Sequence, residues 1–204
     1  MKRLTIYYTL VLVTLTQYSC HLIDSKRAVV SEAIKETSVV TNDSILSGHP
    51  ISFYINHKGI PQVCKDLFKN TRQPSDEVDV LALLDSVFTS NDETRPFYFL
   101  TITQTMTKAD GAYAEPLGMM GKQFVETRTK EFVGYFHNES LLTDKDFDEW
   151  AKTVAGEIEI SSSGREKEEL HGLKEKMKLN CEKCDERQIK TINDFVDRVG
   201  HHSP

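Results

Sequence analysis

The chain has 204 residues and a formal net charge of −6, from 25 Lys and Arg against 31 Asp and Glu. This length suits one domain that buries a hydrophobic core. The acidic balance argues against nucleic acid as a partner, because nucleic-acid-binding surfaces gather positive charge, and it argues equally against a polybasic membrane contact.

The chain begins with the organisation of an export signal. Lys2 and Arg3 supply a positive start, and residues 4–15 form an apolar run without a charge. This run is shorter than the roughly 20 residues that a transmembrane helix needs to cross the hydrocarbon core. The sequence therefore predicts a cleaved signal peptide over residues 1–19.

The end of this run determines how the signal is cut. Ordinary signal peptidase prefers small residues one and three places before the cut, but Gln17 and Tyr18 hold the third place for cuts after Ser19 and Cys20. The segment 16–20 instead resembles the lipobox of bacterial lipoproteins, in the looser form familiar in Bacteroidetes. The small Ser19 before Cys20 carries the resemblance, whereas Gln17 stands where the lipobox prefers Leu or another aliphatic residue.

The lipobox resemblance implies that Cys20 becomes the acylated first residue of the mature protein. Residues 20–50 would then be the lipidated cysteine and a tether, anchored to the lipid bilayer of a bacterial cell envelope, with the outer membrane as the expected site. Stable anchoring requires more than one acyl chain, since each buried methylene contributes about 0.8 kcal/mol. Removing Lys2 and Arg3 leaves 23 basic against 31 acidic residues, a net charge of −8. The periplasmic and surface faces both stay open.

The remaining residues, 51–204, are predicted to form a single all-α domain, an irregular array of about six to eight antiparallel helices. One short extended segment is expected near 51–55, where ISFYI alternates apolar and aromatic residues. Beyond it, apolar positions recur at helical spacing between Pro, Ser and Gly breakers. The expected apolar faces fall within 63–68, 80–88, 97–106, 117–125, 132–136, 147–158, 170–177 and 189–199.

One of these helices rests on a weaker pattern. The segment 97–103 reads Phe-Tyr-Phe-Leu-Thr-Ile-Thr, which is rich in strand-favouring residues. We predict a helix because the run from Pro96 to Ala109 has no turn residue and is long for one strand. Ser75 is expected to cap a helix that carries its apolar face to Phe88.

Other local signals indicate how helices begin and pack. Thr143 has the character of an N-cap, and Asp185 with Gln188 has the pattern of a capping box. Gly118 and Gly121 fall inside an expected helix, where each glycine costs about 1 kcal/mol relative to alanine. We therefore predict that a neighbouring helix approaches closely at this pair.

Three cysteines remain after lipidation: Cys64, Cys181 and Cys184. In an oxidising envelope a structural disulfide is expected, and Cys181–Cys184 is the simplest pairing. The Cys-x-x-Cys spacing also suits a redox dithiol, although no βαβ pattern surrounds it. A zinc site completed by His201 and His202 departs from the spacing of zinc fingers.

The sequence contains no recognisable catalytic motif with its context. The patterns of serine hydrolases, zinc peptidases and phosphate-binding loops are missing. Residues 144–148 begin like a calcium loop, yet Glu149 and Ala155 stand where an EF-hand needs Gly and Glu. We expect no catalytic residues, no cofactor and no metal site.

These features favour a non-enzymatic binding protein with an unknown protein partner. An immunity protein that neutralises a secreted antibacterial toxin is the specific hypothesis, since negative surfaces speed the capture of basic partners. The alternatives are an envelope scaffold or assembly factor, and an enzyme of unknown class whose Asp, Glu and His residues converge only in the fold.

Overall fold

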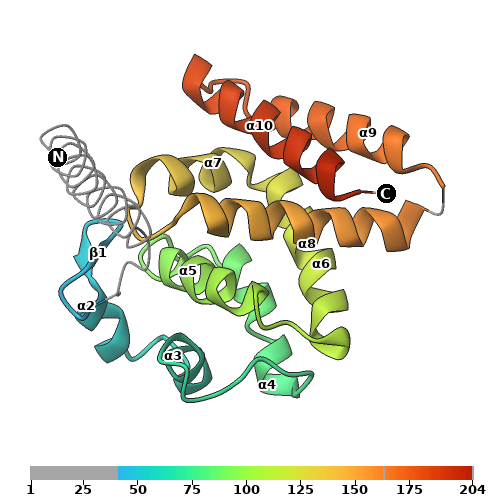
Figure 1. Cartoon of the computed structure of the whole chain (residues 1–204). Coiled ribbons are helices and arrows are strands. Elements are labelled where there is room, and N and C mark those ends of the chain that lie inside the picture. The colour runs from blue at the N-terminus through green and yellow to red at the C-terminus, as the bar shows by residue number, and fades with distance from the viewer. Residues whose placement is uncertain (1–40, 163, 204) are drawn as a thin grey trace, which may run out of the picture. The chain divides into compact units, whose positions relative to one another are not determined.

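The computed structural model describes residues 41–162 and 164–203, and it confirms the all-α prediction for them (Figure 1). The predicted signal peptide, Cys20 and tether residues 21–40 lie outside the described residues. The described elements are β1 (Ile45–Leu46), β2 (His49–Pro50), α2 (Ile51–Asn56), α3 (Gln62–Phe68), α4 (Val78–Leu81), the 3₁₀ helix η1 (Leu84–Phe88), α5 (Arg95–Met106), α6 (Gly111–Thr127), α7 (Thr129–Asn138), α8 (Asp144–Ser162), α9 (Glu166–Leu179) and α10 (Glu186–His202).

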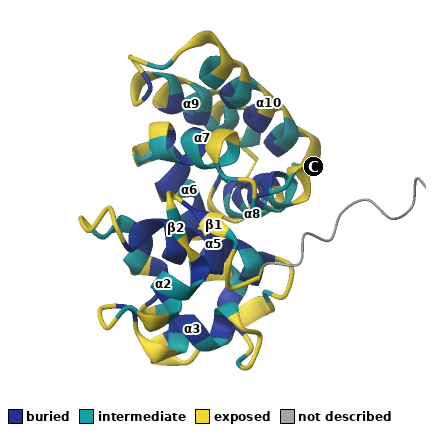
Figure 2. Cartoon of the chain, turned by 90° about the vertical axis from the view of Figure 1, so that its left-hand side faces the viewer, coloured by how far each residue is buried: buried dark blue, intermediate teal, exposed yellow. Residues whose placement is uncertain are grey.

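Helix α5 lies in the middle of the fold and is buried on nearly all sides, as its dark blue ribbon shows (Figure 2). It contacts α3, η1 and α8. Even its polar Thr101 and Thr103 are buried. A helix enclosed in this way has no polar face, so its sequence lacks the 3.6-residue period of a surface helix. The prediction of a helix over 97–103 is confirmed despite the strand-favouring residues.

An aromatic cluster around Trp150 joins α5, α6, α7 and α8. The Trp150 ring stacks on Phe99 with a centroid distance of 4.9 Å, and Phe124 and Phe132 approach it at 5.8 and 5.4 Å. Its indole N–H donates a 2.9 Å hydrogen bond to the Thr103 hydroxyl, which donates in turn to the Phe99 carbonyl at 2.8 Å. The one polar atom of the buried indole is therefore satisfied.

Helices α6 and α8 approach closely at the two predicted glycines. A Cβ atom at Gly118 would lie 3.2 Å from the Cβ of Glu157, and one at Gly121 would lie 3.6 Å from the methyl group of Thr153. A larger residue at Gly118 would push the helices apart. The close packing that glycine allows therefore offsets its conformational cost in the helix. The close-approach prediction is confirmed.

Helices α9 and α10 form a hairpin that packs on α8. The predicted capping box at the start of α10 is confirmed: the Asp185 carboxylate accepts from the Gln188 N–H at 2.9 Å, and the Gln188 side chain accepts from the Asp185 N–H at 3.0 Å. Thr143 likewise precedes α8, and its hydroxyl accepts from the Asp146 N–H at 3.2 Å.

The prediction of an extended segment near 51–55 is wrong, because these residues form α2. Ile51 and Tyr54 lie three residues apart and share one buried face. The extended backbone precedes them, where β1 and β2 pair around Ser47 and Gly48, whose φ values are 47° and 83°. Glycine adopts positive φ at little cost, so the breaker at this position makes a hairpin turn.

This hairpin is part of the helical unit, although the sequence predicts a tether through residue 50. Leu46 is 1% exposed, and its carbonyl accepts a 2.8 Å hydrogen bond from the Tyr54 hydroxyl. The Glu139 carboxylate at the end of α7 accepts from the Ser47 N–H at 2.9 Å and from its hydroxyl at 2.7 Å. The packed chain therefore begins before residue 51.

The helix predicted from Ser75 to Phe88 forms as two shorter pieces, α4 and η1, and Glu77 rather than Ser75 is the N-cap. Arg72 donates two 2.7 Å hydrogen bonds to the Asp79 carboxylate, which holds the first turn of α4 to the preceding loop. In η1 the tighter 3₁₀ turn places Leu84 and its i+3 neighbour on the same buried side.

Candidate functional site

A groove of about 410 Å³ lies between the end of α5, the start of α6 and the outer side of α8; we call it the α6–α8 groove. Small residues from the turn between α5 and α6, from α6 and from α8 form much of its surface: Ala109, Ala114, Gly118 and Gly156. The same small residue at Gly118 that lets α6 and α8 come together leaves open space beside the contact. The groove is thus a consequence of how these helices pack.

Four charged side chains line the α6–α8 groove: Glu115 from α6, and Glu149, Lys152 and Glu157 from α8. Their formal sum is two negative charges. No ion pair joins any of the four to another residue of the described chain, so the excess negative charge is not neutralised by contact.

One other acidic site in the described chain is paired with an arginine side chain. The Arg198 guanidinium lies 2.7 Å from the Asp144 carboxylate and 3.2 Å from that of Asp194. This contact, with its hydrogen bond, lowers the pKa of Asp144, and it occupies the acidic segment that begins like a calcium loop. The α6–α8 groove differs because its carboxylates face solvent without such a partner.

Glu157 is the groove carboxylate whose pKa the surroundings change. Burial raises the pKa of its carboxyl group above the ordinary value. The Lys122 ammonium and a hydrogen bond with Ser161 act in the opposite direction, and the Glu115 carboxylate makes the smallest contribution, raising the pKa further. Both raising effects penalise the ionised form. A cation that entered the groove would relieve this penalty.

Replacing Glu157 with glutamine is expected to leave the melting temperature unchanged or to raise it at neutral pH. Because the folded-state pKa is raised, ionised Glu157 opposes folding, and this cost grows as the pH rises through the titration range. Thermal unfolding of both proteins from about pH 4 to pH 7 checks this. As the pH rises, the melting temperature of the variant should increasingly exceed that of the wild type. A variant that melts below the wild type at neutral pH would contradict the raised pKa of Glu157.

The structure places Cys181 and Cys184 in the turn between α9 and α10, where a disulfide joins them. Asn180, next to this turn, donates a 2.7 Å hydrogen bond to the Glu126 carbonyl of α6. Cys64 is distant in sequence, lies in α3 and is a buried free thiol, and burial raises its pKa to about 12. Such a thiol supplies almost no thiolate for exchange with the disulfide.

Loss of the disulfide should weaken the α9–α10 hairpin only modestly. A Cys181→Ala/Cys184→Ala variant is expected to lose at most about 2 kcal/mol of unfolding free energy, since the bridge closes a very short loop. Urea unfolding with and without reductant provides the measurement. Reductant should shift the wild-type midpoint and leave the double variant unchanged; a reductant effect on both would contradict the pairing.

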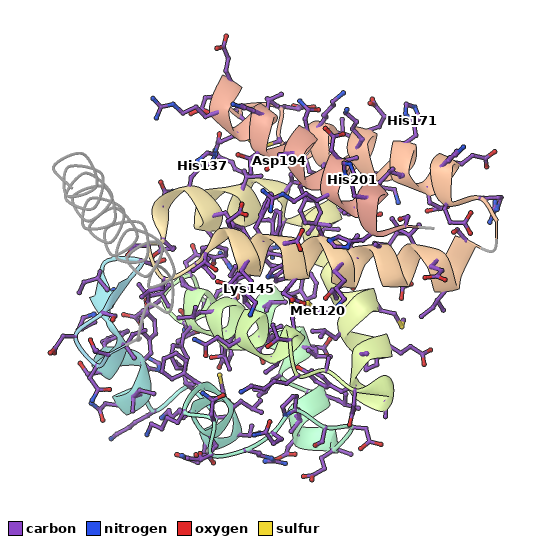
Figure 3. All side chains as sticks on the ribbon, viewed as in Figure 1. Met120, His137, Lys145, His171, Asp194 and His201 are labelled. Carbon is purple, nitrogen blue, oxygen red and sulfur yellow. A yellow bond between two sulfur atoms is a disulfide. The ribbon has the colours of Figure 1, made fainter. Side chains whose placement is uncertain are left out.

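A zinc site shared by the cysteine pair and the C-terminal histidines does not form. Cys184 precedes α10 and His201 lies in its last turn, so roughly 24 Å of helix separates them. Figure 3 shows His137, His171 and His201 on α7, α9 and α10, apart from one another. Across the described ranges, no three His, Cys, Asp or Glu residues group in a way that could hold a metal ion.

Sequence reasoning missed the α6–α8 groove because its residues come from separate elements. One signal was present in α8: Glu149, Thr153 and Glu157 repeat every four residues, beside the apolar face that carries Trp150 and Val154. This pattern indicates a polar stripe, but it does not show that α6 leaves an open space beside it.

The structure says nothing of Cys20, which lies outside the described residues. None of the helices described has both the length and the apolar character needed to cross a membrane. Comparison of the chain with protein-family models, with curated proteins and with solved structures finds no match. The candidate site therefore rests on the geometry of the α6–α8 groove.

Proposed function

We propose that the chain is a lipid-anchored, non-enzymatic binding protein of a bacterial cell envelope, and that it captures a secreted protein toxin as an immunity protein. The α6–α8 groove carries this proposal. It combines an open volume of about 410 Å³ with three glutamates. None of the three forms an ion pair with another side chain of the described residues. Such a surface is complementary to a positively charged protein.

The lipobox-like end of the signal supports the envelope location. Acylated Cys20 would hold the acidic domain at the membrane, where an incoming toxin must pass. The mature charge of −8 acts in the same direction, because long-range attraction raises the rate at which a basic partner is encountered. Anchoring and charge thus serve the same step, which is capture before the toxin reaches its target.

Deleting the gene and challenging the cells with sibling strains tests this role. We expect the deletion strain to lose survival against at least one sibling that secretes a toxin, and the restored wild-type gene to recover it. A restored Cys20→Ala gene should protect less well, because the protein would lack the acyl chains that anchor the mature domain. Unchanged survival of the deletion strain against every sibling would contradict the immunity role.

A further inference from the structure

We infer that the α6–α8 groove receives a lysine or arginine side chain of the partner protein, with its cationic end against the carboxylates of Glu115 and Glu157. This inference rests on the proposed function and specifies the chemistry that the partner presents. Three observations lead to it: the shape of the groove, its unpaired charge and an exposed apolar residue at one side.

The surface of the groove suits a long aliphatic stem. Ala109, Ala114, Gly118 and Gly156 present little side chain, so a methylene chain can lie against them. Lysine and arginine bury such stems along apolar surface while their charged ends stay in polar surroundings. The volume of about 410 Å³ lies within the range of roughly 300–1,000 Å³ typical of ligand sites, which leaves room for adjoining backbone.

The charge of the groove selects a cation. The Lys122 ammonium lowers the pKa of Glu157 through its charge, but it forms its ion pairs with Glu126 at 3.3 Å and Glu169 at 3.6 Å. Lys152 lies in the groove as an exposed side chain without an ion pair in the described chain. A second cation is therefore favoured near Glu115 and Glu157 and disfavoured near Lys152.

Ile160 adds an apolar contact beside the charged site. It lines the groove from the end of α8 and is 65% exposed. Covering this side chain on binding would contribute hydrophobic free energy that a free cation does not supply. The partner segment should therefore place an apolar residue next to its lysine or arginine.

A peptide titration of the full chain in detergent micelles tests the inference. The probes are acetyl-Gly-Leu-Lys-Leu-Gly-amide, its arginine counterpart, and a control peptide with norleucine in place of lysine. Binding is followed by nuclear magnetic resonance from the shifts of Gly156 and Ile160. We expect the lysine and arginine peptides to bind with millimolar dissociation constants and the norleucine peptide to bind about tenfold more weakly.

Two glutamate variants make the test specific. Glu157→Gln should raise the dissociation constant of the lysine peptide about fivefold. Glu159→Gln is the matched control, because Glu159 is exposed on the same helix and is not among the groove residues; it should change the constant less than twofold. Equal binding of the norleucine peptide, equal effects of the two variants, or no shift at about 10 mM peptide would each overturn the inference.

The outcome separates this inference from the proposed function. If the lysine peptide binds as expected but the deletion strain survives every sibling, the immunity role is wrong. The inference that the groove binds a lysine or arginine side chain then still holds. If the wild-type gene protects cells and a Glu115→Gln/Glu157→Gln gene protects equally, the immunity role stands and the groove inference is wrong.

Discussion

Replacing Cys20 with alanine is expected to abolish fatty-acid labelling of the protein and to leave residues 1–19 uncleaved, so that the protein migrates as its larger precursor. Without Cys20 there is no thiol at the position where the proposed lipobox would place the acyl group. More than one acyl chain is needed for stable anchoring, and each buried methylene contributes about 0.8 kcal/mol. Metabolic labelling with an alkynyl fatty acid, followed by cell fractionation and electrophoresis, measures the label and the size of the protein in each fraction.

Cys64→Ala is the matched control for this experiment. Cys64 is a free cysteine that is buried in α3 and is not accessible to acylation. The Cys64→Ala protein should keep full label and remain with the membrane. Label on both the wild type and Cys20→Ala, or on neither, would contradict the lipoprotein assignment.

Replacing Trp150 with alanine is expected to lower the free energy of unfolding by about 3–5 kcal/mol. The change removes the ring that stacks on Phe99 and contacts Phe124 and Phe132 from two further helices. It also opens a cavity at the junction of α5, α6, α7 and α8. Because the chain has one tryptophan, unfolding must be followed by circular dichroism in urea rather than by tryptophan fluorescence.

Trp150→Phe separates the ring from its hydrogen bond and remains measurable if the alanine variant does not fold. Phenylalanine keeps the aromatic contacts but cannot donate to the Thr103 hydroxyl, which now accepts at 2.9 Å. Its cost should therefore be smaller than that of alanine, with about 1 kcal/mol from the lost hydrogen bond. A loss below about 1 kcal/mol for Trp150→Ala would show that the cluster does not hold the helices together.

The elements predicted best are those whose local sequence contains both the period and the ends. In α10, Asp185 and Gln188 form the expected capping box and Ile192, Phe195 and Val199 form one buried face. In α8, the spacing of Phe147, Trp150 and Val154 likewise places these residues on one buried face. For such helices the apolar face and the cap independently indicate the same structure, so a single sequence is sufficient.

The elements predicted less well depend on surroundings that lie far away in sequence. Helix α5 is enclosed, so its residues show no amphipathic period and strand-favouring residues are tolerated. Helix α2 has only six residues, too few to distinguish alternation from helical spacing. Its position is fixed by the hairpin before it and by the Glu139 contact to Ser47, which no local pattern reveals.

The two parts of the proposed function differ in the same way. Cys20 can be proposed from sequence alone, because a signal is read as a linear pattern. The α6–α8 groove cannot, because Glu115 and Glu157 are brought together only when α6 and α8 cross at Gly118. The glycine pair correctly indicates the crossing, yet the space beside it depends on the length and direction of both helices.

Site-specific photocrosslinking in living cells most directly tests whether the groove binds a partner. A photoreactive amino acid replaces Ile160 at the groove or Leu179 at the end of α9, two apolar residues of similar exposure, 65% and 66%. We predict an adduct with a basic protein from position 160, formed in lower yield when Glu157→Gln is added, and no such adduct from position 179. The absence of an adduct at position 160, or the same adduct from both positions, would contradict a binding role for the groove.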